Sequence, residues 1–168
     1  TIDEALSRAK KKEAQGYRYS YDMLGEAALT SIDASRYFEA YKAAIEAIGR
    51  QADKNSNVYK RAGISIKLSA LHPRYNESQH ERVMEELPPK LLALARLAKN
   101  YDIALTVDAE ESERLDLSLD VMERVFNDSS LDGWNGFGLA VQSYQKRAFY
   151  VLDWVAALAR KKQRRIMV

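Results

Sequence analysis

Polar side chains that could handle a charged ligand stand near the ends of segments with the pattern of β-strands. The four candidates are Asp22, Lys67, Asp108 and Gln142. In parallel α/β folds, the groups that bind and transform a ligand lie at the carboxyl ends of the strands and in the loops beyond them. We therefore examine the end of each predicted strand for a polar side chain that points inward and could take part in a site.

Lys67 and Asp108 are the pair whose positions follow most directly from the pattern. The segment 63–70 alternates strictly between apolar and polar residues, so its isoleucines and Leu68 share one face while Lys67 lies on the other. The apolar face must meet helices, and Lys67 therefore points to the inner side of the sheet. The same phase in segment 103–108 turns Asp108 inward, which makes it a natural partner for Lys67 on the neighbouring strand.

Three interpretations of this pair are open from the residues alone. An interior lysine is costly unless it is paired, so Lys67 and Asp108 fit a purely structural ion pair. Lys67 equally fits a cation that binds an anionic group of a substrate. It also fits a lysine that forms a Schiff base with a carbonyl compound.

The fourth predicted strand carries small residues on the side that faces inward. Gly138, Ala140 and Gln142 share this face. Two small side chains followed by an amide predict a bulky neighbour, either a planar cofactor that bonds to Gln142 or large residues from across a barrel. In the first predicted strand, Asp22 is the candidate inward acid.

The elements that position these side chains alternate along the chain. Segments with the pattern of strands are followed by segments with apolar residues at helical spacing, and a last strand begins near the end. The predicted strands are 17–24, 63–70, 103–108, 137–142 and 165–168, and the predicted helices are 31–48, 77–100, 112–126 and 145–161. Thr30 or Ser31 is predicted to cap the first of these helices, and Pro88 and Pro89 are predicted to kink or break the second near Leu87.

This alternation predicts a parallel sheet with helical crossovers. An open doubly wound sheet and a (β/α)8 barrel both have this pattern. No G-x-G-x-x-G turn follows the first strand, which argues against the dinucleotide-binding form of the open sheet. About four and a half strand–helix units correspond to roughly half of an eight-unit barrel. We therefore predict an α/β fold in the form of a partial (β/α)8 TIM barrel.

Composition limits the classes of function. With 26 basic and 24 acidic residues in 168, the formal net charge is +2, which gives no general argument for nucleic acid or an anionic membrane as a partner. The chain has no cysteine, which excludes disulfides and thiolate metal sites, and its two histidines stand without partners at metal spacing. No segment reaches the roughly 18 apolar residues that cross a bilayer, and residues 1–12 are too polar for a secretory signal.

Five segments together resemble a known family. They are YRYSYDMLGEAALT (17–30), GISIKLSALHPRY (63–75), TVDAEESERLDLSLD (106–120), GWNGFGLAVQSYQKRA (133–148) and RRIMV (164–168). In type and in order they are similar to the proline dehydrogenase domain of the large bacterial proline-utilisation flavoenzymes. The resemblance covers most of the chain, and agreement over several such runs is highly specific.

The resemblance implies a barrel that holds FAD and oxidises L-proline to Δ1-pyrroline-5-carboxylate, with electrons passed on to a membrane quinone. In the family, the lysine of the IKLSALHPR motif, here Lys67, helps to bind the proline carboxylate, and the aspartate of the DAEE motif, here Asp108, lies beside it. The residues that match positions against the flavin are Ala109, Val141 and Gln142. We expect Asp108 to set the charge state and orientation of Lys67 rather than to act as the main base.

The family pattern continues past this chain. Its next strand motif, which supplies flavin contacts, and a final helix with two substrate-binding arginines have no counterpart in residues 1–168. We therefore expect residues 1–168 to form the N-terminal half of the barrel and to need the remainder of the barrel as a partner. Alone, this half is expected to be inactive and prone to self-association through its open strand edges. The resemblance implies a cytoplasmic enzyme, allows peripheral association of the full enzyme with the inner membrane, and predicts no nucleic-acid binding by this segment.

Two other functions fit the residues. The first is a different barrel enzyme that uses Lys67 as a Schiff-base lysine, which borohydride trapping of a carbonyl substrate would reveal. The second is a non-catalytic binding module derived from half a barrel. Saturable binding of a protein partner, without affinity for a flavin or a proline analogue, would indicate it.

Overall fold

The computed structural model describes residues 1–23 and 25–168, and a parallel sheet of four short strands lies at its centre. In chain order the strands are β1 (Ser20–Asp22), β2 (Gly63–Ile66), β3 (Leu105–Val107) and β4 (Phe137–Leu139). They pair in the order β1-β2-β3-β4, and Met167 adds a parallel bridge to Gly138 beside β4. The predicted parallel sheet is therefore confirmed.

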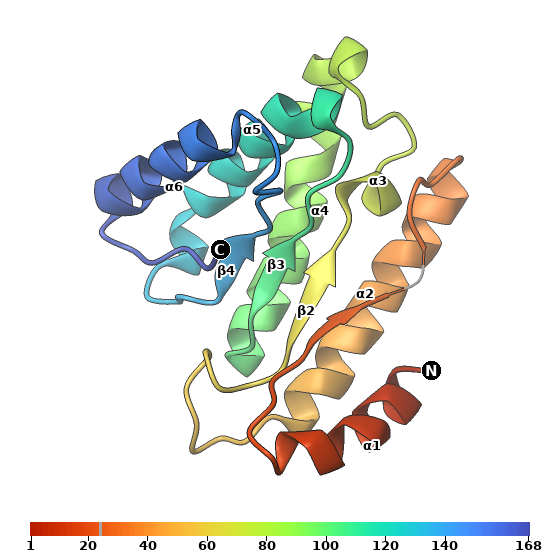
Figure 1. The fold of residues 1–168 in the computed structure, drawn as a ribbon. Helices are drawn as coiled ribbons and strands as arrows, with labels where there is room; N and C mark the ends of the chain where they lie inside the picture. Colours follow the sequence, from red (N-terminus) through yellow and green to blue (C-terminus); the bar gives the residue numbers. More distant parts are fainter. Residues whose placement is uncertain (24) are drawn as a thin grey trace.

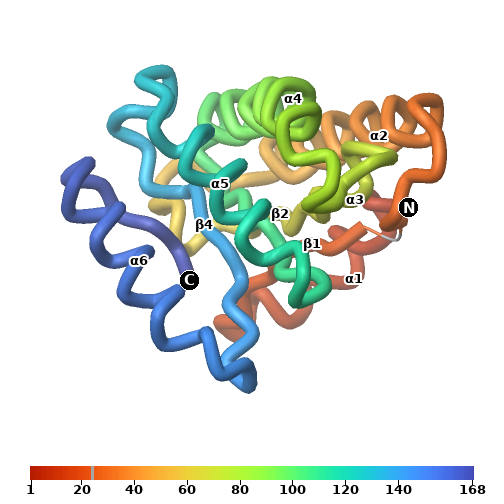
Figure 2. Tube along the Cα trace, turned by 90° about the horizontal axis from the view of Figure 1, so that it is seen from above, coloured from red at the N-terminus to blue at the C-terminus, as the bar shows by residue number. Residues whose placement is uncertain are grey.

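Helices alternate with the strands and cover one face of the sheet (Figure 1). The α-helices are α1 (Ile2–Glu13), α2 (Ser31–Gln51), α3 (Leu68–Leu71), α4 (His80–Tyr101), α5 (Leu115–Phe126) and α6 (Ala148–Lys162), and short 3₁₀ turns lie at Glu77–Gln79, Ser112–Arg114 and Ser129–Leu131. Seen from above, α2, α4, α5 and α6 form an outer arc around the strands (Figure 2). Because the strand order follows the chain order without reversal, the sheet has the arrangement of a barrel wall rather than of a doubly wound sheet. Across the part of the chain that the structure describes, no helix is long and apolar enough to span a membrane.

Helix α2 begins where the sequence predicts. The Thr30 hydroxyl accepts a hydrogen bond from the Asp33 N–H at 3.1 Å, and the Asp33 carboxylate accepts one from the Thr30 N–H at 3.0 Å. This reciprocal capping box satisfies two N–H groups that the first turn leaves free. Further along α2, Tyr41, Ile45 and Ile48 are buried on the face that meets β2 and α4. The cap and the apolar stripe together fix α2 against the strand that carries Lys67.

Of the kink or break predicted near Leu87, a break is wrong, because α4 runs through Pro88 and Pro89 as one helix. A proline inside a helix removes a hydrogen bond and costs about 3 kcal/mol. Helix α4 packs against both α2 and α5, and three of its leucines, Leu87, Leu91 and Leu94, are fully buried. Burial contributes about 2 kcal/mol for each such side chain, so tertiary packing holds the helix through the prolines.

The strands are shorter than the sequence predicts. The first was expected over 17–24, but only its central residues pair, and Leu24 lies outside the described residues. Segment 63–70 pairs as a strand only to Ile66, Lys67 remains extended, and the chain turns into α3 at Leu68. The apolar residues of this segment are buried in both the strand and the helical turn. Alternation of apolar and polar residues therefore could not locate the end of β2.

Helix α1 is not predicted by apolar spacing, because it buries only Leu6 and Ala9. Its signal lies at the start, where the Thr1 hydroxyl accepts from the Glu4 N–H and the Glu4 carboxylate accepts from the backbone nitrogen of Thr1. This is the S/T-x-x-E capping box. The lysines in the last turn of α1 interact favourably with the negative end of the helix dipole.

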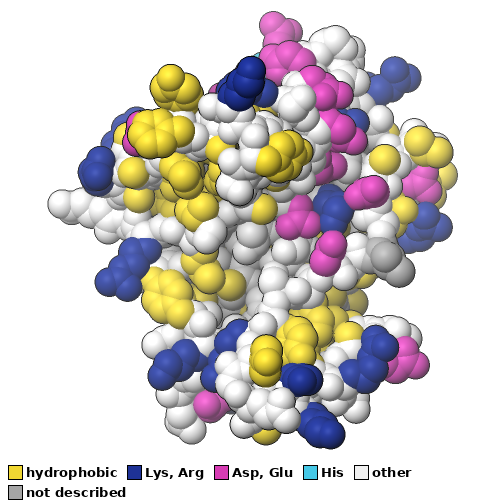
Figure 3. Space-filling view, in the orientation of Figure 1, with side chains coloured by type: hydrophobic (Ala, Val, Ile, Leu, Met, Phe, Trp, Pro, Cys, Tyr) yellow, Lys and Arg dark blue, Asp and Glu magenta, His cyan; other side chains and the backbone are white. Residues whose placement is uncertain are grey.

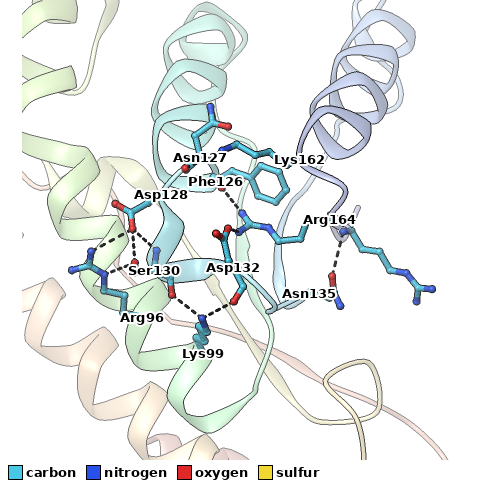
Figure 4. A network of polar contacts seen from close by, with 11 residues as sticks. Arg96, Lys99, Phe126, Asn127, Asp128, Ser130, Asp132, Asn135, Lys162 and Arg164 are labelled. Carbon is cyan, nitrogen blue, oxygen red and sulfur yellow. Dashed lines mark hydrogen bonds and ion pairs between the residues drawn. The ribbon is translucent and has the colours of Figure 1, made fainter.

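A polar network ties the loop before β4 to the helices around it (Figure 4). The Lys99 ammonium, from α4, donates to the carbonyl oxygens of Ser130 and Asp132, both at 2.8 Å. The Arg164 side chain is 6% exposed, donates to the Phe126 carbonyl oxygen, and stacks with its guanidinium carbon 3.7 Å from the centre of the Phe126 ring. These contacts lie at the amino-terminal end of the strands, so they anchor β4 from the side opposite to the candidate residues.

Gly138 is expected to tolerate no side chain. A Cβ built at this position lies 2.7 Å from the Met167 Cβ and closer still to the Met167 carbonyl oxygen, and a backbone atom cannot swing aside. Gly138→Ala is therefore expected to cost about 1–3 kcal/mol of unfolding free energy. It should also open the pairing in which the Leu139 N–H donates to Met167 and the Met167 N–H donates to Phe137. Hydrogen exchange at these two amides in the complete natural chain measures the effect.

Gly133→Asn supplies the control. Gly133 has a φ of 79° and open space where a Cβ would lie, and asparagine adopts this backbone region more readily than most residues. The Gly133→Asn variant should leave hydrogen exchange at the Leu139 and Met167 amides unchanged. If Gly138→Ala left these exchange rates unchanged as well, the close approach of Met167 would not be what requires a glycine.

Candidate functional site

Lys67 lies directly after β2 and is held by two carboxylates. Its Nζ donates to both carboxylate oxygens of Asp22 at 2.8 Å and to Oδ2 of Asp108 at 3.0 Å. Because β1, β2 and β3 are parallel neighbours, three consecutive strand ends bring these charges together. The Lys67 side chain is 16% exposed, that of Asp108 21% and that of Asp22 55%, so water screens the Asp108 contact least. The pairing expected from the strand phases is present, and Asp22 joins it.

The two carboxylates fix the charge of Lys67. Burial by itself lowers the pKa of the Lys67 ammonium, but hydrogen bonds to Asp22 and Asp108 outweigh burial and raise the pKa above its ordinary value. A Schiff base forms from the neutral amine. The geometry therefore favours a permanent cation, which suits an anionic group of a ligand, over a nucleophilic lysine.

The predicted site residues line two adjoining hollows at the carboxyl end of the sheet. Lys67, Ala109 and Gln142 line the more open hollow. Asp108 and Val141 line the narrower one, which Ala109 and Gln142 share. Acidic side chains gather on this end of the molecule (Figure 3). The structure thus brings the predicted cation, carboxylate and cofactor-contact residues to one surface.

The small residues of the fourth predicted strand have different explanations. Gly138 lacks a side chain because the backbone of Met167 occupies that side, so it does not form a wall for a ligand. Ala140 follows the end of β4 and is exposed, with Val141 and Gln142 half-buried after it. The side-chain oxygen of Gln142 accepts a hydrogen bond from the Gln145 amide, which orients the Gln142 amide at the edge of the hollow.

Two side chains that support Lys67 are missed by reasoning from strand phase. The Tyr41 hydroxyl accepts from the Lys67 N–H at 3.1 Å, and the Glu110 carboxylate accepts from the Ser69 N–H at 3.0 Å. In the sequence, Tyr41 belongs to the apolar stripe of a helix, and an acidic residue at Glu110 suits the start of one. The contacts join residues 26 and 41 positions apart, and no local spacing marks them.

His72 is buried near the same end of the sheet and is neutral. Its Nδ1 accepts from the Arg74 N–H at 3.1 Å, so Nε2 carries the proton and donates to Glu86 at 3.0 Å. Burial lowers the pKa of the imidazole, and the hydrogen bond to Glu86 offsets this only in part. These contacts fix the loop after α3. Among the described residues, no group of three or more His, Cys, Asp or Glu side chains is arranged to hold a metal.

Comparison with known proteins identifies the family. A family model described as proline dehydrogenase matches residues 5–168. The chain belongs to the proline dehydrogenase family. "Bifunctional protein PutA" of Escherichia coli (strain K12) is 54% identical over 168 residues, which is 100% of this chain and 13% of that protein. A crystal structure of bifunctional proline utilization A (PutA) protein matches with a TM-score of 0.90 and 56% identity, over 100% of this chain and 17% of that chain.

Proline dehydrogenases of a different length are also similar to this chain. "Proline dehydrogenase 1" of Bacillus subtilis (strain 168) is 27% identical over 149 residues, which is 88% of this chain and 43% of that protein. The resemblance found in the sequence is therefore confirmed, and so is a fold that matches the barrel-like structures of the family. Membership of the proline dehydrogenase family implies a flavin-dependent oxidoreductase. The chain spans 13% of the length of the Escherichia coli relative.

Proposed function

We propose that this chain supplies the first strands of the active site in an enzyme that oxidises L-proline to Δ1-pyrroline-5-carboxylate. The observation that carries the proposal is the cation Lys67, held between Asp22 and Asp108 at the strand ends of a proline dehydrogenase family member. In this proposal Lys67 binds the substrate carboxylate, and Asp108 holds Lys67 in place.

The substrate carboxylate takes the place that Asp22 fills in the free site. An ammonium group has three N–H donors, and the two oxygens of Asp22 and one oxygen of Asp108 accept from Lys67 here. Asp22 is the more exposed of the two acids, so water already competes for its contact. Exchange of Asp22 for the substrate leaves Asp108 in place to orient Lys67. The carboxylate end of the substrate is then fixed, and with it the ring carbon that is oxidised.

The surface beside Lys67 fits a planar flavin. Ala109 and Val141 are small, partly exposed apolar residues, and Gln142 presents an amide on the same surface. An apolar ledge with a single amide suits the face and the polar edge of a ring system. We propose that Ala109, Val141 and Gln142 contact FAD, which when bound supplies the hydride acceptor.

The rest of the natural chain completes the site in this proposal. Residues 1–168 form the N-terminal half of the barrel, and the remaining strands close it against β1 at one edge of the sheet and Met167 at the other. Electrons then pass from the flavin to a quinone. The enzyme is cytoplasmic and associates peripherally with the inner membrane, where the quinone resides.

The complete natural chain tests the proposed function. It should purify as a yellow protein whose flavin absorption bands bleach on addition of L-proline without an external acceptor and return on addition of a soluble quinone. Cyclopentanecarboxylate, which has the carboxylate but no ring nitrogen, should leave the bands unchanged. A colourless protein, or flavin bands that L-proline does not bleach, would refute the proposal. Borohydride trapping of a carbonyl compound on Lys67 would favour a Schiff-base enzyme instead.

A further inference from the structure

The backbone around Lys67 is held at two points by side chains from other elements. The Lys67 N–H donates to the hydroxyl of Tyr41, which comes from α2, at 3.1 Å. The Ser69 N–H donates to the carboxylate of Glu110, which follows β3, at 3.0 Å. Tyr41 is 1% exposed and the Glu110 side chain 10%. Both bonds are therefore shielded from water, which would otherwise compete for the same donors.

Lys67 occupies the N-cap position of α3 but does not cap it. An N-cap side chain normally accepts a hydrogen bond from an N–H in the first turn. The Lys67 side chain is a cation that reaches toward Asp22 and Asp108 and makes no cap bond. Ser69 is the second residue of α3, and Glu110 accepts its N–H instead. Glu110, which follows the neighbouring strand β3, thus takes the place of the capping side chain. The Lys67 side chain is therefore free to face the site.

Tyr41 accepts the hydrogen bond from the N–H of Lys67, which lies between β2 and Ser69. The β2–β3 ladder ends where the Ile66 carbonyl accepts from the Asp108 N–H at 2.9 Å, and the following N–H, that of Lys67, turns to the α2 side. Burial raises the pKa of Tyr41 to about 12, and the bond from Lys67 offsets this only in part. The phenol therefore stays neutral at physiological pH and keeps its oxygen as an acceptor.

The Glu110 side chain lines both hollows but is only 10% exposed, so its carboxylate is largely shielded from water. Burial raises the pKa of Glu110, while the bond from Ser69 and the charge of Arg114, 3.6 Å away, act in the opposite direction. A glutamine at this position would keep an acceptor oxygen for the Ser69 N–H and lose only the charge. An alanine would lose the acceptor altogether.

We propose that Tyr41 and Glu110 are positioning residues for Lys67: they fix the turn from which its ammonium reaches the substrate carboxylate. The proposal rests on the proposed function, because Lys67 must bind that carboxylate for its position to affect proline oxidation. Neither Tyr41 nor Glu110 needs to touch substrate or flavin. Each acts through the backbone of residues 67–69.

The same turn supports the loop that precedes α2. The Ser69 hydroxyl accepts from the Ala27 N–H at 3.1 Å, and the Ser69 carbonyl accepts from the Ala28 N–H at 2.9 Å. Ala27 has a φ of 53°, a left-handed conformation that a non-glycine residue adopts at a cost and only with such support. A loss of the Glu110 contact is therefore expected to loosen this loop together with Lys67.

The experiment compares Tyr41→Phe, Glu110→Ala and Glu110→Gln in the complete natural chain. One readout is the rate at which Lys67 is acetylated by a small amine-reactive ester, followed by peptide mass spectrometry. The second is the KM for L-proline together with the Kd of tetrahydrofuran-2-carboxylate, an analogue in which oxygen replaces the ring nitrogen so that it cannot be oxidised to an imine. Ile45→Val, one helical turn along α2 and fully buried, is the control for a simple loss of stability.

Tyr41→Phe and Glu110→Ala should each speed acetylation of Lys67 and raise both KM and Kd about tenfold, because a misplacement below 1 Å already weakens such contacts. Glu110→Gln should restore most of the wild-type behaviour, and Ile45→Val should change only the melting temperature. If Tyr41→Phe and Glu110→Ala lowered the melting temperature but left the acetylation rate, KM and Kd at wild-type values, the positioning role would be overturned. A wild-type chain that neither oxidises L-proline nor binds the analogue would sink the proposed function, and the acetylation rates would still decide whether Tyr41 and Glu110 position Lys67.

Discussion

Lys67→Met is expected to lower kcat/KM for L-proline about thirtyfold or more, because loss of one partner of a buried, hydrogen-bonded charge pair costs about 2–5 kcal/mol and each 1.36 kcal/mol is a factor of ten. The variant removes the proposed carboxylate-binding cation. It also leaves Asp22 and Asp108 facing each other without the ammonium that both contact. Steady-state kinetics with L-proline, at matched flavin content, measure the effect.

Lys42→Met is the matched control. Lys42 lies on α2 and contacts Glu39 at 2.9 Å, and its side chain is 40% exposed. Its loss should leave kcat/KM unchanged, because exposed pairs of this kind contribute little. The kcat/KM of Lys67→Arg should lie between the values of the wild type and Lys67→Met, since arginine keeps the charge but replaces a compact ammonium with a planar guanidinium. Activity of Lys67→Met within a few-fold of wild type would show that the carboxylate is bound elsewhere.

The position of Lys67 could be predicted because it depends on local pattern. Alternation through Ile66 sets which side of β2 faces the helices, and parallel strands place their carboxyl ends at one edge. The contact with Asp108 follows from these two facts. The structure places the same pair at 3.0 Å.

The end of β2 and the continuation of α4 could not be predicted, because long-range contacts decide them. The chain leaves β2 after Ile66 because Tyr41 and Glu110, both distant in the sequence, accept the N–H groups of Lys67 and Ser69. Helix α4 continues through Pro88 and Pro89 because it packs between α2 and α5. The prolines predicted a kink or a break there, and packing keeps the helix unbroken.

The reason for a glycine at position 138 could be predicted only in part. The absence of a side chain at the inner face of β4 was visible in the sequence and suggested a cofactor or a crowded interior. The structure assigns that space to the backbone of Met167, a neighbour that joins the sheet only after α6. Val141 and Gln142, which we propose to contact the flavin, lie beyond the end of β4.

Asp108→Asn is expected to reduce kcat/KM for L-proline about thirty- to a hundredfold, at the lower end of the cost of disrupting a shielded charge pair. Asparagine keeps the shape of the side chain and removes the charge that orients Lys67. Asp22→Asn should have the smaller effect, because Asp22 is 55% exposed against 21% for Asp108 and gives way to the substrate in the proposed function. The same kinetic measurement ranks the two variants.

A double variant separates an effect through Lys67 from a direct one. If Asp108 acts only by orienting Lys67, adding Asp108→Asn to Lys67→Met should lower kcat/KM little further, because the two losses are not additive. If the double variant loses the full product of both single effects, Asp108 acts on the substrate by itself, and the orienting role would be withdrawn.

The pH dependence of analogue binding tests the charge that Asp108 imposes on Lys67. Tetrahydrofuran-2-carboxylate has no amine, so weakening of its binding at alkaline pH reports loss of the proton from a protein cation. Burial lowers the pKa of Lys67, and the bonds to Asp22 and Asp108 raise it to a net value above the ordinary one. Without the Asp108 charge the pKa of Lys67 falls, so the alkaline loss of binding should begin at a lower pH in Asp108→Asn than in the wild type. An alkaline limb at the same pH in both proteins would show that Asp108 holds the position of Lys67 but not its charge.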